Sequence, residues 1–307
     1  MKITVCCLFA IVFFASCQKE DATPVSNYNL VFKFVFDSTQ PRLNSIVQPS
    51  TIPAGNAALS PVFNVMSAHY IELAPSATTL LGQGEILYKA PETTTGGNTA
   101  IDFSQSTAVA NGGTFFTIPI KNINLGSYEW LRVSLAYQNY DIKYHVDTTI
   151  TTPLGNLNVN QVNTGTVASF IGFNTYLANL KIKNESLAVN GNRKQGFWAF
   201  ETSFNLGGTN YVYKDSAQAP ANATTVVNPI QATSPIPAGS CVVTAAFKPG
   251  KLTITGNETS DIVVEVSLST NKSFEWKEKV SNGLWDPLKG EQVVDMGVRG
   301  MIPTLKQ

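Results

Sequence analysis

The chain has 307 residues, of which 43% are hydrophobic, and its 21 basic side chains balance its 21 acidic ones. This hydrophobic content supports a folded core and excludes a disordered stalk. Because there is no excess of positive charge, the composition argues against a nucleic-acid partner and offers no polybasic contact for lipid headgroups.

The N-terminal segment has the layout of a secretory signal peptide: Lys2 supplies one positive charge, an apolar run follows, and small residues lead to Cys17. The run is shorter than the roughly 20 residues that a membrane-spanning helix needs. Phe14-Ala15-Ser16-Cys17 resembles the lipobox of bacterial lipoproteins. That resemblance implies that residues 1–16 are a cleaved signal peptide and that lipid on Cys17 anchors the protein to a bilayer.

The residues after Cys17 suggest where the anchored protein is displayed. Gln18-Lys19-Glu20-Asp21 resembles the surface-export tag of lipoproteins from Bacteroidota, in which a lysine is followed by acidic residues. The resemblance implies exposure at the surface of the outer membrane. The alternative is a generic polar tether on a lipoprotein that faces the periplasm. In both cases we expect residues 17–27 to form a lipidated tether outside the fold.

Hydrophobic and polar residues alternate with a period of two through most of the remaining chain, as in 30–36, 131–137 and 262–268. Such runs bury one face of a strand and expose the other. Shorter strand-like runs are found at 62–66, 69–74, 85–88, 114–120, 180–182, 197–204, 211–213, 242–247 and 252–255. Turn residues separate these runs, and no long amphipathic helix is evident. The sequence therefore predicts an all-β fold with antiparallel β-sandwich architecture.

The length allows one elaborated domain or two. The threonine-rich stretch from 148 and the asparagine-rich residues after it predict a linker at 148–165. This linker would separate a β-sandwich domain at 28–147 from a second β-rich domain at 166–307, and one continuous domain at 28–307 is the alternative. Residues 215–239 have little periodicity, which predicts a long surface loop.

Cysteine and histidine are too few for most of the chemistry that they support. Outside the signal peptide and the lipid site only Cys241 remains, in an apolar segment, so we expect no disulfide and a small buried thiol. The two histidines are His69, which we expect to share a strand face with Ile71, and His145. With four methionines they make a poor donor set, and no metal or cofactor is assigned.

Two resemblances keep a metal-binding alternative open. A leading β-strand followed by a strand with His69 resembles the order of features in the copper-binding MbnP-like lipoproteins. The segment 282–287, Asn-Gly-Leu-Trp-Asp-Pro, is similar to a degenerate calcium loop, although Val280 replaces one of the oxygen ligands that such a loop needs. The other interpretation of this segment is a hairpin turn on Asn282-Gly283 between the last strands.

Aromatic residues provide the leading hypothesis for function. Tyr128, Trp130 and Trp285 are the candidates for a glycan-binding surface, since rings that are apolar on their faces and polar at their tips suit wet interfaces. Core packing is the alternative for each ring. The acidic residues are scattered, and no motif of the common hydrolases is present, so no catalytic residue is assigned. We therefore expect a surface ligand-binding or adhesion module, with a β-sandwich hydrolase and a metal-binding lipoprotein as alternatives.

Overall fold

The computed structural model describes residues 27–152, 155–206, 208–236 and 240–306. The expected signal peptide, Cys17 and the tether up to Ser26 lie outside the described residues. Within the described part the chain forms strands and short 3-10 helices, with no α-helix. The 3-10 helices are η1 (Phe103–Gln105), η2 (Ile120–Asn122) and η3 (Pro287–Lys289). None of the described helices is long and apolar enough to cross a membrane.

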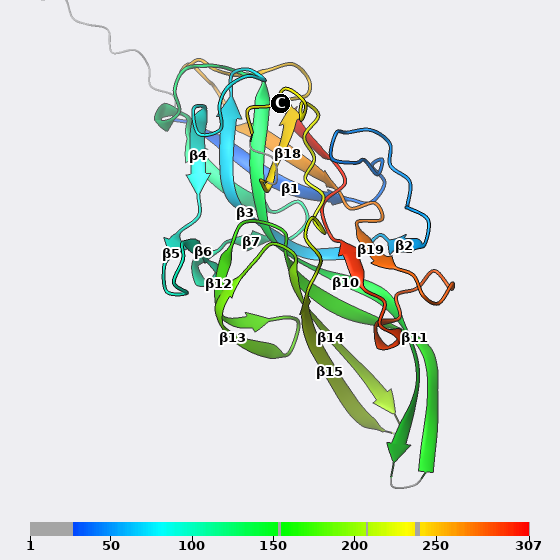
Figure 1. Ribbon diagram of the computed structural model, residues 1–307. Coiled ribbons are helices and arrows are strands. Elements are labelled where there is room, and N and C mark those ends of the chain that lie inside the picture. Colours follow the sequence, from blue (N-terminus) through cyan, green and yellow to red (C-terminus); the bar gives the residue numbers. More distant parts are fainter. Residues whose placement is uncertain (1–26, 153–154, 207, 237–239, 307) are drawn as a thin grey trace, which may run out of the picture.

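An eight-stranded antiparallel sheet runs through the molecule in the order β15-β14-β11-β10-β3-β4, with β16 also paired to β10 and β7 to β3 (Figure 1). Its strands are β3 (Val62–Ala74), β4 (Glu85–Lys89), β7 (Ala108–Val109), β10 (Trp130–Thr152), β11 (Gly155–Phe170), β14 (Phe197–Leu206), β15 (Thr209–Gln218) and β16 (Val242–Ala246). We call this the central sheet.

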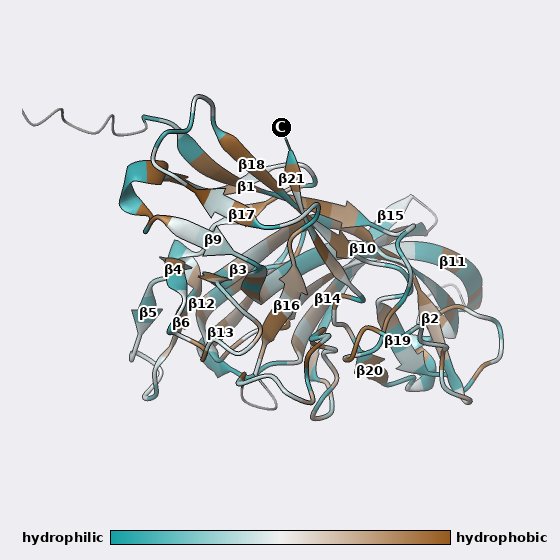
Figure 2. Cartoon of the chain, turned by 90° about the horizontal axis from the view of Figure 1, so that it is seen from above, coloured by the Kyte–Doolittle hydropathy of each residue, from teal (hydrophilic) through white to brown (hydrophobic). Residues whose placement is uncertain are grey.

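Three smaller sheets and a two-stranded ribbon complete the fold (Figure 2). The first has the order β21-β18-β1-β8, the second β13-β12-β6-β5, the third β2-β19-β20, and the ribbon is β17-β9. Their strands are β1 (Asn29–Asp37), β2 (Asn56–Leu59), β5 (Glu92–Thr93), β6 (Ala100–Asp102), β8 (Thr114–Pro119), β9 (Gly126–Tyr128), β12 (Thr175–Lys181), β13 (Ser186–Arg193), β17 (Leu252–Ile254), β18 (Ile262–Ser269), β19 (Phe274–Lys277), β20 (Val293–Asp295) and β21 (Met301–Lys306).

The hydrophobic core lies on both faces of the central sheet. On one face Phe32 of β1 and Val133 of β10 belong to one large cluster, which also contains Trp276 of β19. On the other face Phe170 of β11 packs with Leu177 of β12 in a second cluster. The predicted all-β, sandwich-like architecture is therefore confirmed. Two of the strand pairs, β1–β18 and β12–β6, are parallel, which the prediction of antiparallel sheets missed. Both join strands far apart in the chain, where no tight hairpin fixes the direction.

The linker predicted at 148–165 is wrong. These residues form the outer part of a β10–β11 hairpin, in which Thr148 pairs with Val159 and Thr152 with Gly155. Asn156-Leu157-Asn158-Val159 has the period-two alternation of a strand, and its high asparagine content hid this pattern. We call residues 141–152 and 155–166 the arm, because they project from the body in Figure 1.

The halves of the chain on either side of the arm share sheets and core. β1 pairs with β18 from Leu30 to Asp37, although the two strands lie at opposite ends of the sequence. The loop predicted at 215–239 also begins later than expected, since Asp215–Gln218 is the last part of β15.

Candidate ligand-binding cleft

The structure contradicts two of the three predicted glycan-binding aromatics. Tyr128 is 4% exposed and its hydroxyl donates to the carbonyl oxygen of Asn124. Trp285 is 1% exposed and its indole N–H donates to the carbonyl oxygen of Glu291. Both rings are packed in the main core, so neither offers a face to a sugar. Trp130 is half-buried at the start of β10, where it pairs with both β3 and β16.

In and next to the segment resembling a calcium loop, backbone N–H groups and the side chain of Asn282 bond to protein carboxylates. The carboxylate of Glu291 accepts hydrogen bonds from the backbone N–H groups of Lys279, Val280 and Asp286. The side chain of Asn282 donates to Asp286. The hairpin-turn interpretation was also too simple, because the turn lies inside a long loop between β19 and β20.

The two histidines have separate carboxylate partners. Nε2 of His69 lies 3.1 Å from Glu92, and Nδ1 of His145 lies 2.7 Å from Asp286. Among the described residues no group of three or more histidine, cysteine, aspartate and glutamate side chains could hold a metal ion. The described residues therefore supply no donor set for the copper site that the MbnP-like resemblance implies.

A β-bulge shapes the most prominent cleft in the described part of the molecule. Along β3, Tyr70 pairs with Ser134 and Ala68 pairs with Leu135, which leaves His69 as the extra residue. An extra residue reverses the faces that follow it. Ala68 and Ile71 therefore both point into the main core, while His69 and Tyr70 line the opposite side. The expectation that His69 shares a face with Ile71 was wrong for this reason.

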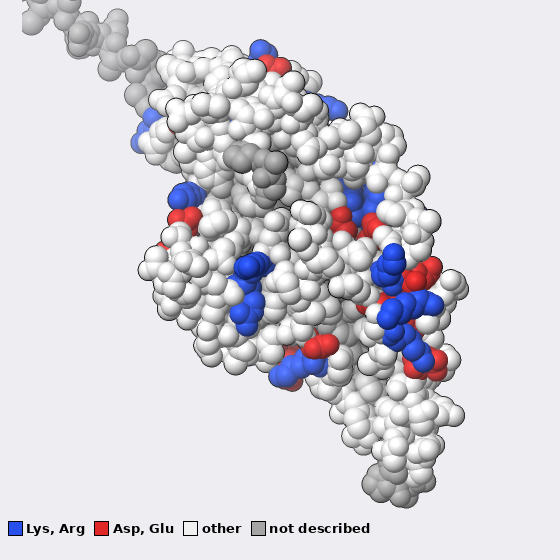
Figure 3. All heavy atoms as spheres, in the orientation of Figure 1, with Lys and Arg blue, Asp and Glu red and all other residues white. Residues whose placement is uncertain are grey.

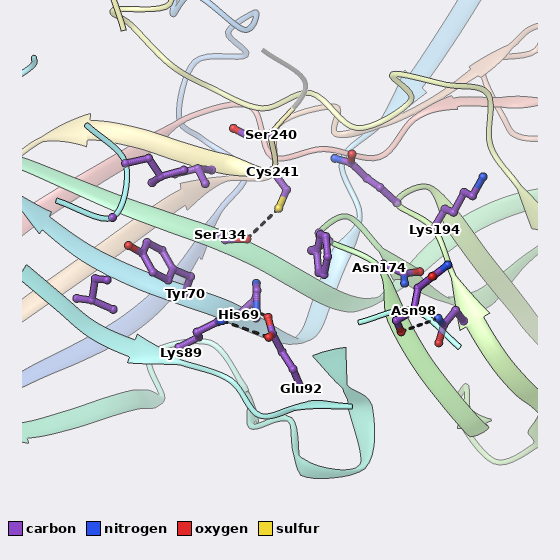
Figure 4. Close-up of a pocket in the computed structure, with 18 of the residues that line it drawn as sticks. His69, Tyr70, Lys89, Glu92, Asn98, Ser134, Asn174, Lys194, Ser240 and Cys241 are labelled. Atoms are coloured by element: carbon purple, nitrogen blue, oxygen red, sulfur yellow. Dashed lines mark hydrogen bonds and ion pairs between the residues drawn. The ribbon is translucent and has the colours of Figure 1, made fainter. Parts of the chain in front are cut away.

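The cleft has a volume of about 850 Å³ and is open to solvent. This volume falls within the roughly 300–1,000 Å³ of typical small-molecule sites. Its walls come from β3, β4, the loop that precedes β12, the end of β13 and the segment that enters β16 (Figure 4).

An exposed phenylalanine that stacks on a largely buried histidine forms one side of the cleft. Phe173 is 42% exposed, and its ring stacks on that of His69 with centroids 5.8 Å apart and planes 13° apart. Gly172 places Phe173 there: a Cβ at this position would lie 2.2 Å from the carbonyl oxygen of Leu135. Only glycine lets the loop approach β10 so closely, and no local sequence pattern predicts this contact.

Amide side chains form much of the polar rim. Asn174 donates to the carbonyl oxygen of Thr99, and Asn192 donates to those of Gly96 and Asn98. These bonds fix the rim loops and use the amide N–H groups, while Oδ1 of Asn192 is a buried acceptor with no partner among the described atoms. The amide side chains therefore hold the rim loops in place.

Four side chains of the cleft, Cys241, Ser134, His69 and Glu92, belong to types that act in catalysis. Sγ of Cys241 lies 2.9 Å from Oγ of Ser134, and burial raises the pKa of the thiol. Burial also lowers the pKa of His69, against the opposing effect of Glu92. Glu92 is the sole carboxylate among the described lining residues, whereas hydrolysis of a glycosidic bond by the usual route requires two.

Comparisons with models of protein families, with curated proteins and with solved structures found no match. The assignment of function therefore rests on the cleft itself. No simple sequence pattern marks this cleft, because its residues come from six separate segments and its shape depends on the bulge at His69.

Proposed function

We propose that this chain is a lipid-anchored protein of the bacterial outer membrane, displayed at the cell surface, that binds a glycan in the cleft beside Phe173. The single observation that carries the binding role is the open cleft of about 850 Å³ with an exposed aromatic ring at its side. Lipid anchorage is supported by the lipobox-like segment that ends at Cys17.

The chemistry of the cleft supports a neutral, hydroxyl-rich ligand. The ring of Phe173, which His69 supports by stacking, offers a flat apolar face, which suits the C–H face of a sugar ring. The exposed side chain of Asn98 at the rim suits hydroxyls, since an amide presents both a donor and an acceptor. Lys89 forms an ion pair with Glu92 at 3.2 Å, which leaves Lys194 as the other charged side chain among the described lining residues.

Glycan binding is tested with the purified full chain on a glycan array, followed by calorimetry with each glycan that binds. Phe173→Ala should weaken binding about three- to ten-fold, since aromatic contacts contribute about 0.5–1.5 kcal/mol beyond area burial. The matched control is Leu125→Ala, which removes a side chain that is 67% exposed and lies outside the cleft. If no glycan binds, or if both variants bind like the parent, the proposal of a glycan ligand fails.

Anchorage is tested separately by palmitate labelling in cells. Cys17→Ser should abolish labelling, while Cys241→Ser should retain it, because Cys241 is largely buried in the folded body. Labelling that persists in Cys17→Ser would contradict the lipid site without affecting the proposal for the cleft.

A further inference from the structure

A second, smaller cavity lies at the edge of the central sheet, away from the glycan cleft. It has a volume of about 220 Å³ and is lined by residues of β14, β15 and the loop 278–292. No residue lines both cavities. The volume is below the roughly 300–1,000 Å³ of sites for whole drug-sized ligands. It suits a single small head group.

The strand register explains why aromatic residues gather there. Phe200 of β14 pairs with Asp215 of β15, and Trp198 pairs with Ala217. Directly paired residues lie on the same face of a sheet. The face that carries Trp198 and Phe200 therefore continues to Tyr213 and Asp215 on β15, the last strand in the sheet order.

The loop 278–292 closes the other side of this cavity. The ring of Trp285 makes edge-to-face contacts with Trp198 and Phe200, at centroid distances of 5.7 and 5.2 Å. Glu291 from the same loop also lines the cavity, and it is 4% exposed. Four aromatic residues and two acidic residues therefore line one small space, in which Phe200, Trp285 and Glu291 are buried and Tyr213 and Asp215 are exposed.

The charged side chains among the described lining residues are acidic: Asp215 and Glu291 line the cavity, and no lysine or arginine does. The carboxylate of Glu291 accepts hydrogen bonds from three backbone N–H groups, whereas Asp215 is exposed. Lys289 pairs with Asp147 at 3.0 Å, and the ammonium of Lys279 donates to the carbonyl oxygen of Lys289 next to the lining residue Gly290. Asp215 is therefore the charge that a cation from outside meets.

The cation–π contact found among the described residues lies elsewhere. It joins Arg193 to Phe197, which belongs to the second core cluster on the opposite face of the central sheet. Of the rings that line the small cavity, Tyr213 is 39% exposed and Trp198 is 8% exposed, so these two are the ones that a ligand can reach. A cation near the face of tryptophan or tyrosine is attracted by the ring quadrupole, and aromatic cages of this kind recognise quaternary ammonium groups.

We propose that the cavity lined by Trp198, Tyr213 and Asp215 binds a small organic cation, with a quaternary ammonium head group as the ligand class. The rings of Tyr213 and Trp198 contact the methyl groups, the buried ring of Trp285 supports Trp198 from behind, and the carboxylate of Asp215 supplies the opposing charge at the mouth. This site is independent of the proposed glycan cleft, and neither proposal requires the other.

The test is calorimetry on the purified full chain with choline and with its uncharged isostere 3,3-dimethylbutan-1-ol. Choline should bind saturably in the millimolar range, and the isostere should bind more weakly, since it has the same shape but no charge. This comparison needs no variant and so does not depend on how substitutions fold. Absence of saturable choline binding, or equal binding of the two compounds, overturns the proposal.

Two variants locate the site. Asp215→Asn and Tyr213→Ala should each weaken choline binding about three- to thirty-fold, as expected for loss of a cation–π or charge contact. The matched control is Tyr211→Ala, since Tyr211 lies on the same strand and face with 38% exposure but does not line the cavity. If the three variants bind choline equally well, the ligand occupies a different place and the assignment is wrong.

Discussion

The two halves of β10 lie in different surroundings. From Leu131 to Tyr140 every side chain is buried, because other sheets cover both faces of the central sheet. From Asp141 onward buried side chains alternate with more exposed ones, as Ile142 and Tyr144 do with Lys143. One continuous strand therefore has a two-sided core in the body and a one-sided core in the arm.

In the two halves of β10, polar side chains find their hydrogen-bond partners in different places. In the body half, Arg132 is fully buried, and its guanidinium donates to the carbonyl oxygen of Thr79 and lies 3.6 Å from Glu72. In the arm half, polar side chains such as Lys143 are exposed and can form hydrogen bonds with water. Figure 3 shows no coloured charged atoms toward the tip of the arm on the visible face.

The largest expected effect comes from the body half. Arg132→Met should lower the free energy of unfolding by about 3–5 kcal/mol, because it leaves the buried carboxylate of Glu72 without its cation. The measurement is urea denaturation monitored by circular dichroism. Lys306→Met, which breaks the exposed ion pair with Glu265, should cost less than about 1 kcal/mol.

A double variant separates loss of the cation from loss of packing. Glu72→Gln with Arg132→Met removes both charges and retains an oxygen that can accept from the backbone N–H groups of Gly82 and Gly84. This double variant should be more stable than Arg132→Met alone. An equal or lower stability would mean that the unpaired carboxylate is not the cause.

A smaller effect is expected in the arm. Val159 is 4% exposed and packs in the main core, whereas Val162 on the same strand is 54% exposed. Val159→Ala should cost about 1–3 kcal/mol through lost burial and the cavity left behind. Val162→Ala should change stability by less than about 0.5 kcal/mol. Equal losses in the same denaturation assay would show that the inner face of the arm contributes no core.

The contrast within β10 also explains what the sequence could predict. Alternation identified most strands, including 30–36 and 262–268, because those strands bury one face more deeply than the other. In β10 the alternation over 131–137 predicted that Tyr137 and Leu131 share the buried face of the strand and that Arg132 lies on the exposed face. The register with β3 shifts between Leu135 and Gln138, so Tyr137 instead packs in the second cluster.

The candidate sites were harder to predict than the strands. The cleft depends on the bulge at His69 and on the close approach of Gly172 to β10, neither of which has a local sequence signature. The small cavity depends on the register between β14 and β15 and on a loop distant in sequence. Trp285, which was predicted to bind a glycan, is 1% exposed and belongs to the main core.

The smallest expected effect distinguishes the histidine of the body from that of the arm. At His145, burial works to lower the pKa, but hydrogen bonds to Asn160 and Asp286 and the charges of Asp286 and Asp147 outweigh it, so the pKa is raised above 6.5. At His69, burial dominates the contribution of Glu92 and the pKa is lowered below 6.5. The two side chains should therefore respond to acid in opposite directions.

Protonated His145 stabilises the folded state, so its contribution is fully present below the unfolded pKa of 6.5 and is lost as the pH rises through the raised folded value. Neutral His69 has the reverse behaviour: its contribution is present above 6.5 and is lost as the pH falls through the lowered folded value. Urea denaturation of the parent, His145→Gln and His69→Gln across this range measures both. The stability difference between parent and variant should grow on acidification for His145, by at most about 1 kcal/mol, and shrink for His69. The same trend at both positions would contradict the environments described for them. Acidification should stabilise the fold through a histidine whose pKa is raised by its partners, and destabilise it through one whose pKa is lowered by burial.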